Sequence, residues 1–510
     1  MNNFVGTTIS VELSGPGIAG SQRVPLPDPA RGTLMRPFAV SSGLESAVRG
    51  QLSAIVRGAP NLSAVEAAQL PADWRVWSPF AAVILTSDEF AALDAGRRGA
   101  LRGWVGLGGR LWLSPTEAGE EQVEKFGVGF ITTLAEPVSA PAPAATLAAT
   151  ATTAAQLANV ALEVERRRAA TGRAVPGGGG TMVLPPTLDQ SVVDLWVKKI
   201  RIYDGTPGLP ERDALLLEKS AIGTSVQDPV GAGSMLGMFL VAFAIVIGPV
   251  NLFVFAPATK RHRLFLTTPL ISITATLVLA LMIVLQDGLG GDGMRRALVV
   301  LLPGDNEAAV FQEQAARTGF LTSRVFALAD DTQLTVLPLE AWDARVGFSF
   351  ANTELTRADG RAAGDWFRSR GRQAQLLQRL VPTRGRVERI GTAPGGAPIV
   401  QSSLATPLRS FVCADDAGAL WTVPELPPGK RVTLTRGGSW LGNAATGGSA
   451  RFAEVLAAAA PKEPARWSAR GGATDLAPIA TLASVRWTEA DVLFTGMLEG
   501  AATAAKEATP

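Results

Sequence analysis

The sequence predicts a multidomain membrane protein with an α/β domain, a two-helix transmembrane hairpin and a mainly-β, sandwich-like C-terminal domain. Two uncharged apolar runs of 21 residues, Met235–Phe255 and Phe265–Leu285, are each long enough to cross a bilayer. Before them, apolar strand patterns alternate closely with helical patterns, which is typical of a parallel sheet covered by helices. After them come many short β-runs separated by turn residues, which favours a sandwich-like arrangement.

The amino-acid composition argues against several kinds of functional site and partner. The 510 residues carry 47 Lys and Arg against 45 Asp and Glu, so the net charge of +2 provides no overall field for nucleic acid. A single cysteine, Cys413, excludes an intramolecular disulfide framework and a multi-cysteine zinc site. A single histidine, His262, removes most metal and acid–base chemistry. We therefore expect no cofactor, no metal site and no nucleic-acid partner.

Composition shifts along the chain indicate six segments. They are an N-terminal extension (1–30), an α/β domain (31–133), an Ala/Pro/Gly-rich linker with a helix (134–190), a juxtamembrane segment (191–233), the transmembrane hairpin (234–288) and a mainly-β domain with terminal helices (289–510).

The α/β domain is predicted from its alternating patterns. Strands are expected at Pro37–Ser41, Phe80–Thr86 and Arg110–Ser114, with a late strand at Phe126–Phe130. Amphipathic helices are expected at 44–57 and 97–107, where Gly108 and Gly109 end the second helix.

The series AAVILTSDEFAALDAGRRGALRGWVGLGGRLWLS resembles the class I glutamine amidotransferase-like fold, a flavodoxin-like arrangement, over roughly residues 31 to 133. Enzymes of that family use a cysteine on a tight strand–helix elbow, activated by histidine. This stretch contains neither residue, so the resemblance implies the fold alone. Ser87 and Ser114 end two strands, Asp88 and Glu89 are weak bases, and Lys125 is the only lysine; we expect a catalytically silent domain.

The two apolar runs predict membrane-spanning helices. At 1.5 Å per residue each reaches about 31 Å, which matches a hydrocarbon core of roughly 30 Å. Pro249 and Pro269 lie inside the runs, where spanning helices tolerate proline if neighbouring Ser or Thr side chains compensate. Thr267 and Thr268 stand beside Pro269 for this role.

The connection APATKRHRL predicts the orientation of the hairpin. Lys260, Arg261 and Arg263 lie within nine residues, whereas the far ends of the spans have fewer nearby positive charges. Short loops rich in Lys and Arg stay in the cytoplasm, so we expect the tip inside and both termini outside. Roughly 230 residues must then cross ahead of the first span without a recognisable signal, so we expect the true start to lie upstream.

The region after the hairpin is predicted to be rich in strands. Short β-runs are expected at 297–302, 325–328, 333–337, 398–400, 409–413, 420–423 and 431–435. Helices are expected near the end, at Arg451–Ala459 and Thr488–Leu498.

The stretches IGPVNLFVFAPATKRHRLFLTTPL, GDWFRSRGR, PTRGRV and LRSFVCADDAGALWTVPELPPGKRVTL resemble a group of uncharacterised bacterial membrane proteins, well over about 230 to 440. Genes of that group often accompany a MoxR-type ATPase and von Willebrand factor A proteins. The resemblance implies an accessory membrane component. The chain departs from the group at its N-terminus, where such proteins usually carry a signal and an extra β-domain.

Three other features of the sequence bear on possible chemistry. Gly15–Gly20 matches G-x-G-x-x-G, but three prolines follow within a few residues, where a dinucleotide site needs a helix. His262 fits the basic tip better than a catalytic triad. Cys413 sits in an apolar strand pattern and is interpreted as a half-buried structural thiol, with attachment of a lipid or a partner as the alternative.

The best binding candidate in the sequence is the set Trp366, Arg368, Arg370 and Arg372. Alternating arginines beside an aromatic side chain can hold an anionic group or lipid headgroups, and the same period of two suits the exposed face of a strand.

These patterns together favour a non-enzymatic scaffold or sensor in a bacterial inner (cytoplasmic) membrane, with both domains outside and a protein or envelope partner. The alternative is an envelope hydrolase that uses carboxylates or a serine without histidine. A transporter is disfavoured because the two spans contain no charge.

Overall fold

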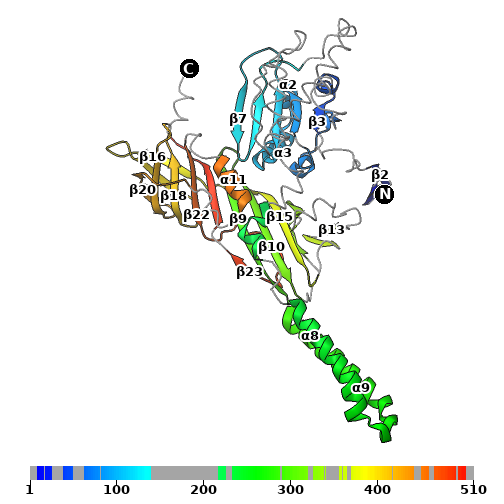
Figure 1. Ribbon diagram of the computed structural model, residues 1–510. Helices are drawn as coiled ribbons and strands as arrows, with labels where there is room; N and C mark the ends of the chain where they lie inside the picture. The colour runs from blue at the N-terminus through cyan, green and yellow to red at the C-terminus, as the bar shows by residue number, and fades with distance from the viewer. Residues whose placement is uncertain are drawn as a thin grey trace, which may run out of the picture. The chain divides into compact units, whose positions relative to one another are not determined.

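The computed structural model in Figure 1 describes part of the chain. The described residues are 8–15, 18–25, 38–49, 62–80, 82–138, 216–225, 232–287, 290–319, 326–337, 339, 355–358, 360–364, 369–415, 417–440, 449–458, 465–489 and 492–500. Two compact units are present: Met1–Arg212 with Val300–Ala309, and Asp213–Val299 with Val310–Pro510. The expected linker helix and most of the juxtamembrane segment lie outside the described residues.

The first unit begins with a β-hairpin. Strand β1 (Thr8–Gly15) pairs antiparallel with β2 (Ile18–Pro25), and Gly15 lies opposite Ile18 at the turn. Gly15 of the G-x-G-x-x-G match therefore lies at the end of one strand, and Gly20 lies within the next, opposite Leu13. No helix opens there, and a helix N-terminus is what a pyrophosphate site requires.

A mixed six-stranded sheet forms the α/β domain. Its strands are β3 (Phe38–Ser41), β4 (Leu62–Val65), β5 (Ala82–Thr86), β6 (Arg110–Ser114), β7 (Gln122–Phe126) and β8 (Gly129–Thr133). The order is β4-β3-β5-β6-β8-β7, and all pairs are parallel except β7 with β8. The α/β prediction is confirmed at this level. The chain leaves β3 toward one side of the sheet and β5 toward the other, which makes their carboxyl ends a topological switch point.

Helices and apolar strands bury the core of this domain. Short helices lie at Ala67–Gln69, Trp74–Trp77 and Ser87–Ala92 (α2), and α3 spans Ala95–Gly106. Asp94 caps α3 by accepting a hydrogen bond from the Arg97 amide at 2.8 Å. Leu101 and Val105, four residues apart, are fully buried because they share one face of the helix.

One predicted strand of this domain is wrong. Phe126–Phe130 contains the last residue of β7, the turn at 127–128 and the first two residues of β8. Gly127 adopts φ 61°, and a Cβ there would lie 2.6 Å from the carbonyl oxygen of Gly106. The glycines in this run serve a tight turn under α3, and a single strand would not need them.

The hairpin consists of two long helical stretches (Figure 1). The first is α8 (Ala232–Ile245), which continues as a π-helix over Val246–Phe255. A short 3-10 helix at Ala258–Arg263 leads into α9 (Leu264–Asp287). Gly237–Phe255 and Lys260–Met282 are long and apolar enough to cross a membrane, as the sequence predicts. The π-helix contains Pro249, whose missing amide disrupts the regular α-helical ladder.

The C-terminal region is rich in strands, as expected. A ten-stranded sheet runs β12-β15-β10-β9-β24-β22-β18-β19-β21, with β23 paired to β9, and two further sheets have three strands each. The strands of the large sheet are β9 (Gly291–Leu302), β10 (Glu307–Thr318), β12 (Thr332–Leu337), β15 (Arg372–Pro382), β18 (Leu408–Ala414), β19 (Leu420–Leu426), β21 (Thr435–Arg436), β22 (Arg466–Gly471), β23 (Val485–Glu489) and β24 (Val492–Met497). The small sheets contain β11 (Phe326–Ala327), β13 (Leu355–Ala358) and β14 (Arg361–Gly364), and β16 (Val387–Thr392), β17 (Pro398–Ser402) and β20 (Arg431–Thr433).

The second predicted C-terminal helix is wrong. Thr488–Leu498 contains the end of β23 and all of β24. Strand β24 lies between β9 and β22, and Val492, Leu493 and Phe494 are at most 3% exposed. A strand buried on both faces is apolar at every position, so its period resembles that of a buried helix. The first predicted helix is confirmed as α11 (Ala450–Ala458).

One face of the large sheet packs against segment 216–225, which contains helix α7 (Ala221–Thr224). Leu217 and Ile222 of this segment are fully buried in a cluster formed with the sheet residues Ala315, Leu337, Ala374 and Leu376. The chain is therefore fixed to the sheet just before the first span begins.

Candidate functional site

The carboxyl edge of the α/β sheet is the first place to look for chemistry, because ligands in such folds bind at the switch point. Ser41 ends β3 there, and its hydroxyl donates to Glu89 Oε1 at 2.6 Å. The other oxygen of Glu89 accepts from the Thr86 amide at 2.9 Å, and the Glu89 amide donates to Thr86 Oγ1 at 3.1 Å. This is a capping box at the start of α2. The carboxylate of Glu89 thus holds three elements together.

The other polar residues of this edge also bond within the domain. Ser114, which is 3% exposed, accepts a hydrogen bond from the Val138 amide at 2.9 Å. Asp88 accepts from the Thr116 hydroxyl at 3.0 Å, and Ser87 is the first residue of α2. Ser114 therefore sits where a nucleophile could stand, but its hydroxyl serves the chain that follows β8.

The two spans expose almost all of their apolar surface. Only 6% of the first span and none of the second is buried inside the protein. Phe253 and Phe265 are 73% and 89% exposed near the tip. An exposed apolar surface of this kind is typical of a membrane-contacting or protein-contacting region. At the tip, Lys260, Arg261 and Arg263 are all exposed, in keeping with a solvated basic turn.

A polar contact ties the two spans together near the tip. Asn251, 1% exposed, donates from Nδ2 to Thr268 Oγ1 at 3.0 Å. The Ala256 amide bonds the Asn251 carbonyl at 2.9 Å, five residues back, as a π-helix requires. The sequence identified Thr268 only as a support for Pro269, and the structure gives it Asn251 as a partner.

The structure describes two of the four residues in the predicted binding set. Trp366 and Arg368 lie outside the described residues. Arg370 and Arg372 are both exposed, and Arg372 begins β15. Arg370 does not continue a strand, because it adopts φ 58° in the turn that precedes Gly371. The strand interpretation of the alternating arginines therefore fails at Arg370.

Cys413 is more deeply buried than predicted. It is 1% exposed in β18, and burial, together with the nearby Asp415 carboxylate, raises the pKa of its thiol to about 12. A thiolate is the reactive form of cysteine, so Cys413 is inert at neutral pH. Its burial also disfavours the attachment of a lipid or a partner to the folded unit.

A fully buried carboxylate lies on the helix-covered face of β10. Glu313 accepts a hydrogen bond from the Ser449 hydroxyl at 2.6 Å, and Arg451 Nε lies 3.8 Å from its other oxygen. Ser449 also accepts from the Phe452 amide at 3.2 Å at the start of α11. The cluster fixes this helix to the sheet, and Ser449 is 0% exposed.

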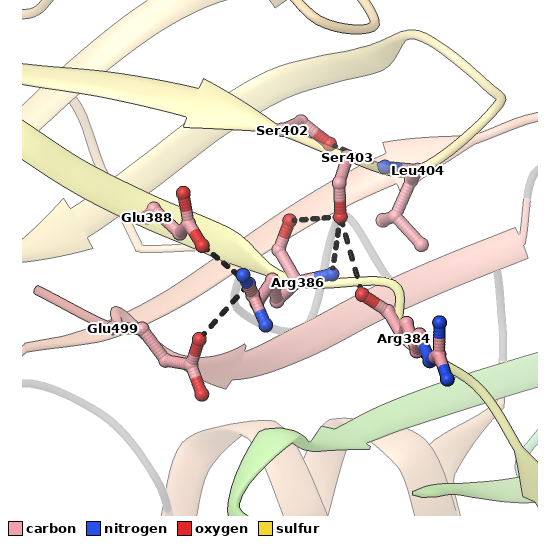
Figure 2. A network of polar contacts seen from close by, with 7 residues as sticks. All are labelled: Arg384, Arg386, Glu388, Ser402, Ser403, Leu404 and Glu499. Carbon is pink, nitrogen blue, oxygen red and sulfur yellow. Dashed lines mark hydrogen bonds and ion pairs between the residues drawn. The ribbon is translucent and has the colours of Figure 1, made fainter. Parts of the chain in front are cut away.

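A second polar cluster joins the β16–β17 sheet to the end of the described chain (Figure 2). Arg386 Nε bonds Glu388 and lies 3.2 Å from Glu499 Oε2. The Ser403 hydroxyl accepts from the Arg386 amide at 2.9 Å. Each charge in the cluster has an opposite neighbour, which is what a structural cross-link requires.

Among the described residues, no group of three or more His, Cys, Asp and Glu could hold a metal ion. No protein-family model matches the chain. No curated protein matches it either.

Proposed function

We propose that the protein is a non-enzymatic scaffold or sensor of a bacterial inner membrane, with both folded domains outside the cytoplasm. The observation that carries the proposal is the exposure of two adjacent apolar helices that contribute almost nothing to either core. The partner we propose is a protein of the membrane or envelope, in a system with a MoxR-type ATPase, as the resemblance of residues 230 to 440 implies.

The exposed charges of the tip support this orientation. Lys260, Arg261 and Arg263 lie together on one short helix between the spans. The positive-inside rule keeps such a turn in the cytoplasm, which would leave Ala232 and Asp287 at the opposite surface.

The carboxyl edge of the α/β domain supports the absence of catalysis. Nucleophilic amide chemistry needs a side chain that a nearby base can activate and a substrate can reach. Ser41 and Ser114 are buried, and both are hydrogen-bonded within the domain. Glu89, the adjacent carboxylate, is occupied as a cap.

Reporter fusions test the orientation. A fusion at Thr259 should report cytoplasm, and a fusion after Pro510 should report the exterior. Replacing Lys260, Arg261 and Arg263 together by glutamine should weaken this preference. The matched control replaces the exposed residues Lys430, Arg431 and Arg436 of the strand-rich unit, and should leave the topology unchanged. An external signal at Thr259 in the wild-type protein would place both domains inside and overturn the orientation.

Crosslinking in native membranes tests the partner. We expect a MoxR-type ATPase or a von Willebrand factor A protein among the proteins recovered with the intact chain. Repeated recovery of the chain alone, at native expression levels, would contradict an accessory role.

An envelope hydrolase is the alternative. Two serine–carboxylate pairs, Ser41–Glu89 and Ser449–Glu313, have the 2.6 Å contacts that such chemistry uses. Both serines are 0% exposed, so a substrate would need the domains to open. Covalent labelling of the intact protein by a fluorophosphonate, abolished by Ser41→Ala or Ser449→Ala, would favour the hydrolase.

A further inference from the structure

The turn that carries Arg370 is bonded to the chain where it leaves the second span. Helix α9 ends at Asp287, and Gly290 follows three residues later, at most about 10 Å along the chain. The Gly319 amide donates to the Gly290 carbonyl at 2.8 Å, and the Arg370 amide donates to the Gly319 carbonyl at 3.0 Å. Two backbone hydrogen bonds, through Gly319, therefore link Arg370 to Gly290, just after the end of the second span.

Arg317 and Arg372 lie at the same end of the sheet. The Thr318 amide donates to the Gly371 carbonyl at 2.9 Å, and Gln314 bonds Gln375 at 3.0 Å. Between these two contacts the residue number falls by four in β10 and rises by four in β15, so the strands are antiparallel. Arg317 therefore lies directly opposite Arg372. We call Arg317, Arg370 and Arg372 the membrane-proximal corner.

The chain before the first span reaches the same part of the sheet. Leu217 and Ile222 pack against Ala315 and Ala374, each two residues from Arg317 and Arg372 respectively. Because side chains alternate along a strand, Arg317 and Arg372 belong to the face that this segment covers. Both connections to the hairpin therefore meet the sheet at the membrane-proximal corner.

The backbone conformation of Arg370 would suit glycine better than arginine. A φ of 58° is adopted freely by glycine and costs other residues roughly 1 kcal/mol. Arginine nevertheless occupies the position, and the residue is exposed.

The neighbouring strands carry residues suited to a bilayer surface. Strand β23 pairs with the first residues of β9, so that Trp487 lies beside Gly293. Arg295 stacks over the Trp487 ring, with its guanidinium carbon 5.7 Å from the ring centroid. Tryptophan and arginine together are typical of membrane interfaces. Asp292, a carboxylate at this end, pairs with Arg486 at 2.9 Å.

We propose that the membrane-proximal corner binds the phosphate groups of anionic phospholipids in the leaflet from which the hairpin emerges. Guanidinium groups match phosphate with two parallel hydrogen bonds, and each basic residue near an anionic surface strengthens attachment roughly fivefold. The corner then fixes the strand-rich unit against the bilayer. The inference rests on the proposed membrane insertion, but it holds for either orientation of the hairpin.

The test uses the full chain in lipid nanodiscs made of phosphatidylcholine with increasing phosphatidylglycerol. Native mass spectrometry measures the phosphatidylglycerol that stays bound on release. Arg370→Gly and Arg372→Gln remove the two exposed charges, and Arg370→Gly does so at a position whose backbone suits glycine. Arg384→Gln is the matched control, because this exposed arginine lies just beyond the other end of the 11-residue β15, about 34 Å away. Figure 2 shows that Arg384 contacts Ser403 through its main-chain carbonyl.

We expect the apparent affinity for phosphatidylglycerol to fall roughly fivefold for each corner variant and to stay unchanged in Arg384→Gln. Hydrogen exchange in β10 and β15 checks that the variants remain folded. Folded corner variants that retain as much phosphatidylglycerol as the wild type would overturn the proposal, as would an equal loss in Arg384→Gln. Free inorganic phosphate that competes fully with the lipid would show an anion site without lipid selectivity and would also overturn it. Failure of the wild type to enter nanodiscs would instead refute the proposed membrane function.

Discussion

Two sheet edges in this molecule carry polar side chains, and they use them differently. At the carboxyl edge of the α/β sheet, Ser41, Thr86 and Glu89 bond one another, and Ser114 bonds the following chain. At the membrane-proximal corner, Arg370 lies exposed in a turn and Arg372 lies exposed at the start of a strand. Polar residues at strand ends can thus cross-link neighbouring elements of the domain, or they can form an exposed binding surface. Short side chains that reach the backbone favour the first role, and long cationic ones favour the second.

The largest expected effect is at Glu89. Glu89→Ala removes the capping box and the acceptor of the Ser41 hydroxyl, so the α/β domain should lose about 2–3 kcal/mol of stability. Hydrogen exchange of the β3 and β5 amides in the full-length protein measures the loss. Glu120→Ala, an exposed carboxylate in the same domain, is the control and should change little. A Glu89→Ala protein as stable as the control would mean that the hydrogen bonds of Glu89 do not stabilise this edge of the sheet.

A smaller loss is expected at Ser114. Ser114→Ala leaves the Val138 amide without its acceptor, at a cost of about 1 kcal/mol, and should leave the cellular role intact. The wild-type protein should release no ammonia from glutamine. Ammonia release that disappears in Ser114→Ala would show that the edge is an active site after all.

The smallest effect has the opposite sign. Arg370→Gly relieves a left-handed backbone conformation, and we expect a gain of about 0.5–1 kcal/mol in the stability of the strand-rich unit. Thermal unfolding in detergent, compared with Arg384→Gln, measures it. Destabilisation by Arg370→Gly would show that the side chain supports the fold, and the contrast between the two edges would disappear.

Sequence patterns were sufficient where one physical requirement dominated. The runs around Ile84 and Leu111 are buried on both faces of a parallel sheet, and their continuous apolarity predicts them. The spans were predictable for the same reason, since lipid demands apolarity over a fixed length. The π-helix over Val246–Phe255 was not, because a proline in a span is compatible with several backbone paths.

Strand β10 shows why the C-terminal region was harder. Its sequence, EAAVFQEQAART, is composed of good helix formers, yet it is a central strand. Gln312 and Gln314 are fully buried and bond each other at 2.9 Å, and Gln314 bonds Gln375 of β15. Gln312 also bonds the Ile479 amide at 2.6 Å. These partners are up to 167 residues away, so the pairing that overrides helix propensity is invisible locally.

The binding candidates were only partly accessible to sequence reasoning. The arginine spacing pointed to Arg370 and Arg372, but not to Arg317, which lies across β10. The contact between Ser41 and Glu89 was not predictable, because the two residues are 48 positions apart. The place of Ser41 at the end of a predicted strand is the feature that could have drawn attention to it.

The contact between Asn251 and Thr268 has a consequence for the synthesis of the protein. The two residues are 17 positions apart, on opposite spans. Until the ribosome has delivered Thr268, the Asn251 amide has no interhelical acceptor, and a bare amide in lipid is unfavourable. If the hairpin is inserted as we propose, the first span should therefore wait at the insertion machinery and enter the bilayer together with the second. Nascent chains that end before Thr268 should remain associated with the translocon, whereas chains that include the whole of α9 should be released into lipid.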